Sequence, residues 1–229
     1  MIENFINKIT LGDCLEVMKQ LPDKCIDLIL TDPPYGIKAN SMQMGRNGYK
    51  LPRSDNEWDS EIPKDEVFLE MFRVSKNQII FGGNYFPILW NYGGKGFIFW
   101  DKNQPQNSFM DCFADGELAW TSFNKPAKRY KYSYFGNIDG NTKAGDKIHP
   151  TQKPLKLFEM ILRDYFKPTE VSGGGLIADF YSGSGTTAIA CHNLGLDFIA
   201  VEKDAGYYNS SVQRLKDAQA QQKLFFMYE

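Results

Sequence analysis

The segment T-D-P-P-Y-G, residues 31–36, places side chains capable of chemistry directly after an apolar run. Pro33 and Pro34 fix their own φ angles and carry no N–H, so they hold the backbone extended and leave their carbonyl oxygens available. The Asp32 carboxylate and the adjacent carbonyl form a pair of acceptors, which suits an –NH2 group with two hydrogens to donate. Tyr35 adds a face on which a planar ring can stack, typically worth about 1–3 kcal/mol per base. The segment predicts a pocket for an aminated heterocycle.

Each part of this segment also has a purely structural explanation. Asp-Pro-Pro is a common way to end a strand, and Tyr35 could belong to the half-buried core. The functional interpretation is favoured because all four residues stand together at a strand end, where an open α/β sheet binds its ligands.

A second segment, D-F-Y-S-G-S-G-T-T, begins at Asp179 and is expected to turn from a strand into a helix. Gly183 and Gly185 allow a tight turn and a close approach of the backbone to a ligand. A helix that begins near Thr186 offers free N–H groups to a carboxylate or phosphate. Glu202 follows Asp179 by 202 − 179 = 23 residues, at a strand end where an acid can accept both hydroxyl protons of a ribose.

The glycine turn narrows the class of ligand. It lacks the third glycine of the dinucleotide pattern and the Gly-Lys-Ser/Thr of a phosphate-binding loop. Alone it could be only a tight β-α turn, but the acid at the end of the next strand favours a nucleoside. Without a pyrophosphate signature, a nucleoside that bears a carboxylate, such as S-adenosylmethionine, is the ligand that we expect.

The elements that must position these two segments alternate between strand and helix. This alternation predicts an α/β fold with a doubly wound, mostly parallel sheet and helices on both faces. Residues 36–62 and 124–148 follow neither period, so we expect loop insertions there. The expected strands lie within 7–13, 25–31, 78–83, 97–102, 117–123, 175–179 and 197–202, and the expected helices near 15–21, 68–72, 155–165 and 186–194.

Composition excludes several classes of protein. At 229 residues and 42% hydrophobic, the chain can bury one substantial core, and its net charge of −2 argues against binding nucleic acid by overall charge. No apolar run approaches the roughly 18 residues of a membrane span, so we expect a soluble, unprocessed, cytoplasmic protein. With no CxxC pair and only two histidines, the cysteines indicate neither a metal site nor disulfides, and we expect reduced, buried thiols at Cys14, Cys25, Cys112 and Cys191.

The order of the two segments resembles that of the DNA amino-methyltransferases, which methylate exocyclic amines. L-G-D-C, E-W-D at 57–59, F-I-F-W-D-K and H-P-T-Q-K-P at 149–154 also match that family in kind and order. With the base motif before the donor motif, the chain resembles the β-type arrangement, which implies a circularly permuted, Rossmann-like methyltransferase sheet and a single S-adenosylmethionine-dependent domain over 1–229. Phe180-Tyr181 departs from the Pro-Phe more often found, and we expect it to alter turn geometry only.

The resemblance also assigns roles to individual residues. Asp13 would meet the adenine amine of the donor, although it could equally cap the following helix. Lys153 would help anchor the donor's methionine end, although a solvated side chain is the commoner state of a lysine. The residues implied to bind the flipped base and direct catalysis are Asp32, Pro33, Pro34 and Tyr35, and those implied to bind the cofactor are Asp13, Lys153, Asp179, Phe180, Gly183, Ser184, Gly185, Thr186 and Glu202.

The expected substrate is double-stranded DNA, methylated by direct in-line transfer to a base that has rotated out of the duplex. D-P-P-Y resembles the N6-adenine members more than the N4-cytosine members, where Ser often replaces Asp, so adenine is expected and cytosine is the alternative. Residues 124–148 hold six basic and two acidic residues, a balance of 6 − 2 = +4, interleaved with tyrosines. The candidate DNA-binding residues are Lys125, Lys128, Arg129, Lys131, Lys143 and Lys147, although any one of them could simply belong to a solvated face.

Other functions remain open on the sequence alone. Methyltransferases of RNA adenine or of glutamine side chains would share the acceptor chemistry, but they resemble an Asn-Pro-Pro-Tyr loop placed after the donor motif. A nicotinamide-linked oxidoreductase would leave Asp-Pro-Pro-Tyr unexplained, and a non-catalytic DNA-binding relative would not need both motifs intact. A homodimer and a restriction endonuclease partner are compatible with the sequence.

Overall fold

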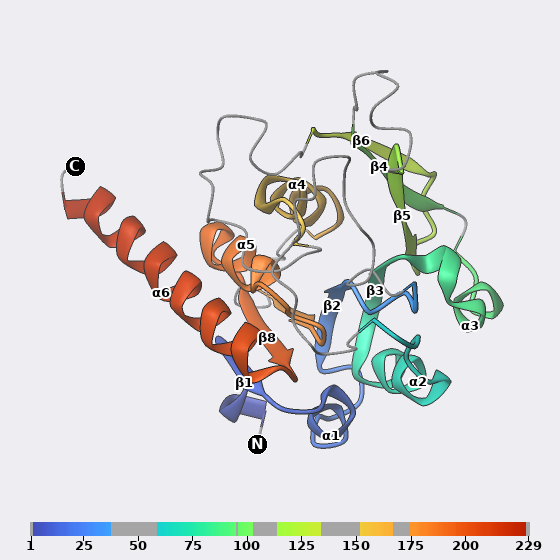
Figure 1. The fold of residues 1–229 in the computed structure, drawn as a ribbon, viewed down its shortest axis with the longest axis horizontal. Coiled ribbons are helices and arrows are strands. Elements are labelled where there is room, and N and C mark those ends of the chain that lie inside the picture. The colour runs from blue at the N-terminus through green and yellow to red at the C-terminus, as the bar shows by residue number, and fades with distance from the viewer. Residues whose placement is uncertain are drawn as a thin grey trace, which may run out of the picture.

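One mixed sheet runs through the part of the chain that the computed structural model describes, residues 2–37, 59–94, 96–102, 114–133, 152–166 and 175–227, with side chains to residue 221. Its strands follow the order β1-β8-β7-β2-β3-β5-β4-β6 (Figure 1). β5 is antiparallel to both neighbours, and the other pairings in this sheet are parallel. The strands are β1 (Lys8–Leu11), β2 (Ile26–Thr31), β3 (Ser75–Phe81), β4 (Phe97–Asp101), β5 (Gly116–Thr121), β6 (Lys128–Lys131), β7 (Leu176–Asp179) and β8 (Asp197–Glu202).

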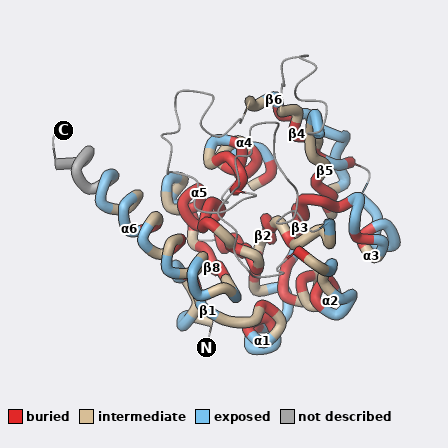
Figure 2. Tube along the Cα trace, viewed as in Figure 1, coloured by how far each residue is buried: buried red, intermediate tan, exposed pale blue. Residues whose placement is uncertain are grey.

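Helices cover both faces of this sheet, which confirms the predicted doubly wound α/β class. α4, α5 and α6 pack on the face that carries Leu28 and Leu30, whereas α1, α2 and α3 pack on the face that carries Ile29. Figure 2 shows burial concentrated in the central strands and on the inward sides of the helices. The helices are α1 (Cys14–Met18), α2 (Asp65–Val74), α3 (Pro87–Asn91), α4 (Leu155–Tyr165), α5 (Thr186–Leu194) and α6 (Ala205–Met227), with short 3-10 turns η1 (Ile2–Asn4) and η3 (Gly83–Tyr85).

The sequence explains why the central elements form where they do. The centre of β2, residues 28–30, is apolar because a strand covered on both faces has no solvent side there. α2 and α4 bury residues at helical spacing, for example Phe68, Met71 and Val74 in α2. α5 is delimited by Gly185 and Gly195, both left-handed at φ 75° and 67°, a conformation that glycine adopts at little cost.

Three elements differ from the sequence prediction. The segment 124–148 was expected as a loop, but Lys128–Lys131 within it forms β6 and pairs in parallel with β4. α3 and α6 were not predicted, and α6 has too little amphipathic periodicity to stand out. Residues 38–58 of the other expected loop, and 134–148 of this one, lie outside the described residues.

Two further expectations concern the cysteines and the membrane. Cys14 and Cys191 are free and buried as expected, whereas Cys25 is partly exposed and Cys112 lies outside the described residues. None of the described helices combines the length and apolarity that crossing a bilayer would take.

The pairing of β2 with β7 brings the two chemical segments to one edge of the sheet. From β2 the chain continues through α2 to β3 on one side, and from β7 it continues through α5 to β8 on the other. The carboxyl ends of β2 and β7 therefore diverge at a topological switch point, the usual ligand position in an open α/β sheet. A buried hydrogen bond of 2.7 Å from Thr31 Oγ1 to Asp179 Oδ1 joins these ends across 148 residues of chain.

Arg73 on α2 links the first helical layer to the loop after α1. Its guanidinium donates to the carbonyls of Met18 at 2.8 Å and Leu21 at 2.9 Å, and it pairs with Glu70 and Asp23. We expect Arg73→Met to lower the free energy of unfolding by about 2 kcal/mol, because carbonyls at a helix end lose charged donors. Urea unfolding measures this loss.

Lys76→Met is the matched control, since Lys76 pairs with Asp27 while its side chain is 56% exposed. We expect it to cost less than about 1 kcal/mol. Equal losses in the two variants would contradict the importance of the carbonyl contacts.

Candidate active site

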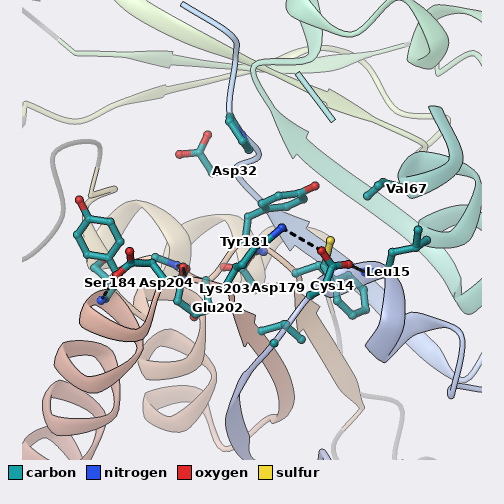
Figure 3. Close-up of a pocket in the computed structure, with 18 of the residues that line it drawn as sticks. Cys14, Leu15, Asp32, Val67, Asp179, Tyr181, Ser184, Glu202, Lys203 and Asp204 are labelled. Atoms are coloured by element: carbon teal, nitrogen blue, oxygen red, sulfur yellow. Dashed lines mark hydrogen bonds and ion pairs between the residues drawn. The ribbon is translucent and has the colours of Figure 1, made fainter. Parts of the chain in front are cut away.

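Both predicted segments line one cavity of about 750 Å³ at the carboxyl edge of the sheet. Figure 3 shows Asp32 on one side and Ser184, Glu202 and Asp204 on another, with Tyr181 between them. Of the predicted catalytic and cofactor-binding residues, Pro33, Tyr35 and Gly185 do not line the cavity. Those that do are Asp13, Asp32, Pro34, Lys153, Asp179, Phe180, Gly183, Ser184, Thr186 and Glu202.

The glycine turn after β7 is fastened to Glu202 at the end of β8. The backbone N–H of Gly183 donates to Glu202 Oε2 at 2.7 Å, and the N–H of Asp204 donates to Oε1 at 2.8 Å. Gly183 and Gly185 both have positive φ, 50° and 75°. Burial raises the pKa of Glu202. Each carboxylate oxygen keeps a further lone pair, so the group can still accept hydroxyl protons.

Arg214, which the sequence analysis did not single out, supports this turn from α6. Its guanidinium donates to the carbonyl of Ser184 at 2.9 Å and to the hydroxyl oxygen of Thr186 at 3.2 Å. The turn is therefore held from β8 on one side and from α6 on the other.

Asp179 joins three elements rather than facing the cavity with a free carboxylate. It accepts hydrogen bonds from the hydroxyls of Thr31 at 2.7 Å and Thr187 at 2.5 Å, and from the N–H of Tyr181 at 3.1 Å. Burial raises the pKa of Asp179 to about 6 against the effect of these donors. Asp179 lines the cavity, and its bonds tie β2, β7 and α5 together; its contact with the cofactor stays a prediction.

Asp13 caps α1, as one of the two interpretations predicted. Its Oδ1 accepts from the N–H of Leu15 at 2.9 Å, and Oδ2 pairs with Lys203 at 3.3 Å. Burial alone would raise the pKa of Asp13, but these contacts outweigh it and lower the pKa. Asp13 also lines the cavity, so a contact with an adenine amine stays a prediction.

Tyr181 corrects one expectation. The Phe180-Tyr181 pair was expected to alter turn geometry only, but Tyr181 lines the cavity alongside Cys14 and Asp13. The residue therefore contributes to the ligand surface.

The Asp-Pro-Pro-Tyr loop is held from two directions. Asp59, the last residue of the E-W-D segment, accepts from the N–H groups of Tyr35 at 2.7 Å and Gly36 at 2.9 Å. The Tyr35 hydroxyl donates to Asp32 Oδ1. One face of the Tyr35 ring stacks on Tyr85 at 4.9 Å between centroids, so the expected stacking of a base on Tyr35 stays a prediction.

Lys153 is buried, whereas the sequence analysis gave a solvated side chain as the commoner state of a lysine. Its side chain is 6% exposed, and the ammonium pairs with Asp32 Oδ2 and, at 3.0 Å, with Glu117 Oε2. Lys102 pairs with the other oxygen of Glu117 at 2.7 Å. These contacts place the ammonium on the side of Asp32, and anchoring of a methionine group by Lys153 stays a prediction.

The four charges of this network balance, and the pKa values of Glu117, Lys153 and Asp32 reflect both their burial and their charged neighbours. Burial would raise the pKa of Glu117, but Lys153 and Lys102 outweigh it and bring it to about 2. Burial would lower the pKa of Lys153, but Asp32 and Glu117 raise it. Burial raises the pKa of Asp32 against the attraction of Lys153. The sequence analysis did not single out Glu117 and Lys102, which join this network through ion pairs, although charged residues beside apolar strands were a signal in their favour.

The predicted DNA-binding residues are not part of the cavity wall where the structure describes them. They lie on or before β6, at the far edge of the sheet from β1. Lys128 pairs with Asp164 at 2.6 Å, and the Lys125 ammonium lies 4.9 Å from the centroid of the Tyr165 ring. Arg129 and Lys131 are exposed on β6, and Lys143 and Lys147 lie outside the described residues.

Comparison with known proteins identifies the family. The model of a DNA methylase family, the N6/N4 methylases, matches residues 97–213, half of the chain. This chain belongs to the N6/N4 DNA methylase family. It is 26% identical to the type II methyltransferase M.HinfI of Haemophilus influenzae, over 94% of this chain and 70% of that protein.

Solved structures agree with this assignment. The M1.HpyAVI–SAM complex is 28% identical, with a TM-score of 0.54 over 90% of this chain and 98% of that one. PvuII DNA methyltransferase (cytosine-N4-specific) shares the fold, at 17% identity and a TM-score of 0.55 over 92% of this chain and 90% of that one. The protein is a DNA methyltransferase that uses S-adenosylmethionine.

Gly82 supports Tyr35 of this methylase. A Cβ atom at Gly82 would lie 2.1 Å from Cε1 of Tyr35, and the φ of Gly82 is 67°. We expect Gly82→Ala to displace Tyr35 from Asp32 and to slow methyl transfer at saturating substrates by about tenfold or more. The measurement is incorporation of labelled methyl groups into DNA.

Gly93→Ala is the matched control, because Gly93 has a similar φ of 62° and open space around its Cβ position. Both variants should lose about 1–2 kcal/mol of stability from the left-handed backbone. A similar loss of activity in both would show that backbone strain, not displacement of Tyr35, is responsible.

The pKa of Glu117, about 2 against an ordinary 4.5, predicts a pH dependence of stability. An acid with a lowered pKa in the folded state stabilises the protein above its unfolded pKa, and this contribution is lost as the pH falls from about 4.5 toward 2. We expect wild-type protein to lose up to about 3 kcal/mol in this range through Glu117. Glu117→Gln should lack this part of the acid-side decline in urea unfolding at a series of pH values. An unchanged slope would contradict the assignment.

Proposed function

We propose that this protein is a site-specific DNA methyltransferase that methylates the exocyclic N6 of adenine in double-stranded DNA. The observation that carries the proposal is the single cavity that Asp32 shares with Gly183 and Glu202. An acceptor for an amine and a site for a nucleoside must open onto one space if a group is to pass directly between their ligands.

The residues of the cavity fit S-adenosylmethionine. Glu202 would accept the ribose hydroxyls, and Asp13 would accept the adenine amine of the cofactor. Phe180 supplies apolar wall, while Ser184 and Thr186 stand at the start of α5, where N–H groups suit a carboxylate. When bound, the cofactor supplies an electrophilic methyl group on a sulfonium sulfur.

The chain's own residues orient the target amine. Asp32 and the Pro33 carbonyl would accept its two hydrogens, which favours a pyramidal nitrogen with a directed lone pair. These acceptors interact most strongly as positive charge develops on the nitrogen, so they stabilise the transition state more than the ground state. Burial raises the pKa of Asp32, which suits a group that also holds the proton lost by the amine.

Adenine is proposed over cytosine because Asp32 occupies the first position of the motif. The segment D-P-P-Y resembles the N6-adenine members more than the N4-cytosine members. Cytosine N4 presents a similar amine edge, so it is the outcome that the test must separate.

We propose further that the chain acts as one methyltransferase domain whose segments 36–62 and 124–148 contact DNA. The exposed residues Arg129 and Lys131 of β6 lie in the second segment. Replacing Arg129 and Lys131 should lower the affinity for DNA, by an amount that depends on the salt concentration.

Asp32→Asn tests the proposed chemistry. We expect methylation to fall about 100-fold or more, because the amide keeps one acceptor oxygen but loses the negative charge that stabilises the developing positive charge on the nitrogen and that can hold the proton lost by the amine. Cofactor affinity, measured by calorimetry, should stay within about threefold of wild type, since Asp32 faces the amine and not the nucleoside. Nucleoside analysis of the methylated DNA should give N6-methyladenine.

Asp27→Asn is the control, because Asp27 lies at the start of β2 and pairs there with Lys76. It should keep wild-type activity. Equal loss of cofactor binding and methylation in Asp32→Asn would show that the two halves of the site are wrongly assigned, and N4-methylcytosine as the product would overturn the choice of base.

A further inference from the structure

We propose that Lys153 exchanges between Asp32 and Glu117 when the target base binds, and that Glu117 is a positioning residue that holds the lysine while the amine contacts Asp32. This inference rests on the proposed function. It gives a role to F-I-F-W-D-K and E-L-A-W, two segments that the functional assignment does not otherwise use.

Both oxygens of Asp32 already have protein donors. The Tyr35 hydroxyl donates to Oδ1, and the Lys153 ammonium donates to Oδ2. A hydroxyl can share an oxygen with a second neutral donor, because each carboxylate oxygen accepts more than one hydrogen bond. The ammonium is the charged donor on Asp32, and it competes with an incoming amine for Oδ2.

An ammonium in contact with Asp32 opposes the chemistry assigned to that residue. Positive charge develops on the target nitrogen during methyl transfer, and a cation beside it raises the energy of that state. The same cation lowers the capacity of Asp32 to take up a proton. Lys153 must therefore leave Oδ2 for Asp32 to act as proposed.

Glu117 is placed to receive the displaced ammonium. Its Oε2 lies 3.0 Å from Lys153 Nζ, and its pKa of about 2 keeps it ionised at neutral pH. The Lys153 side chain is 6% exposed, so the ammonium cannot reach bulk solvent without leaving the core. The rings of Tyr35 and Phe81 flank it at 5.6 and 5.3 Å to their centroids, which further favours a cation there.

Lys102 sets how strongly Glu117 attracts Lys153. It pairs with Glu117 Oε1 at 2.7 Å and is itself 19% exposed in its side chain. Two lysines thus share one carboxylate. Removal of Lys102 would strengthen the pull of Glu117 on Lys153, whereas removal of the Glu117 charge would leave Lys153 on Asp32.

The experiment compares two duplexes that carry the recognition sequence found by methylation mapping. One holds adenine at the target position, and the other holds 2′-deoxynebularine, a purine without the amine. Affinities are measured with S-adenosylhomocysteine present, and the ratio of the two affinities reports the contact between the amine and Asp32. Loss of fold would weaken both duplexes and leave the ratio unaffected.

The two variants should shift this ratio in opposite directions. We expect Glu117→Gln to reduce the preference for adenine about tenfold, because Lys153 then keeps Asp32. We expect Lys102→Met to increase the preference by about threefold. Asp27→Asn, which removes an ion pair at the opposite edge of the sheet, should leave the ratio unchanged.

The outcomes separate this inference from the proposed function. If wild-type protein methylates adenine and prefers its duplex, but both variants shift the ratio in the same direction or neither shifts it, the exchange is refuted. If wild-type protein shows no preference and no N6-methyladenine, the proposed function fails. If the product is N4-methylcytosine, the same comparison uses cytosine against 2-pyrimidinone, and the opposite shifts are still required.

Discussion

The hydrogen bond between Thr31 and Asp179 marks the constraint on which the site depends, the parallel pairing of β2 with β7. These strands come from opposite ends of the chain, and their carboxyl ends carry Asp32, the proposed amine acceptor, and the glycine turn. Because Asp179 also accepts from Thr187 on α5, the same carboxylate fixes the helix whose N-terminus faces the cavity. A shift in this pairing would separate the two halves of the site, although each half would keep its local structure.

Burial of charge is the second constraint. Asp32 and Glu117 are carboxylates in a poorly solvated part of the protein, where an unpaired charge is costly, and Lys153 and Lys102 provide the compensation. Two acids and two bases leave no net charge in the network. The protein can therefore keep the Asp32 carboxylate in a poorly solvated position, and in the proposed mechanism this carboxylate is shared between Lys153 and the target amine.

The sequence predicted the elements and caps that follow from local residue patterns. It could not predict the side-chain contacts between residues that lie far apart in the chain. Strand β2, helix α5 and the cap at Asp13 follow from apolar runs, paired glycines and a short acceptor before a helix. Strand β6 was missed because Tyr130 alone of its residues is buried, so no alternation could show. Lys153 and Glu117 could not be paired in advance, because they lie on elements that meet only after the sheet has formed, and Arg214 sits on a helix with little amphipathic signal.

The reversed direction of β5 has a consequence for how this protein can diverge. In a strand antiparallel to its neighbours, the first residues lie at the edge where the parallel strands end, so Glu117 reaches Lys153 from the beginning of its strand. Lys102 arrives from the end of β4, and its N–H donates to the carbonyl of Asp115 at 2.9 Å, which closes the hairpin just beyond the pair. The charges of Lys102 and Glu117 are therefore held together by the register of β4 and β5, so substitutions that keep this register would also keep the pair as the protein diverges.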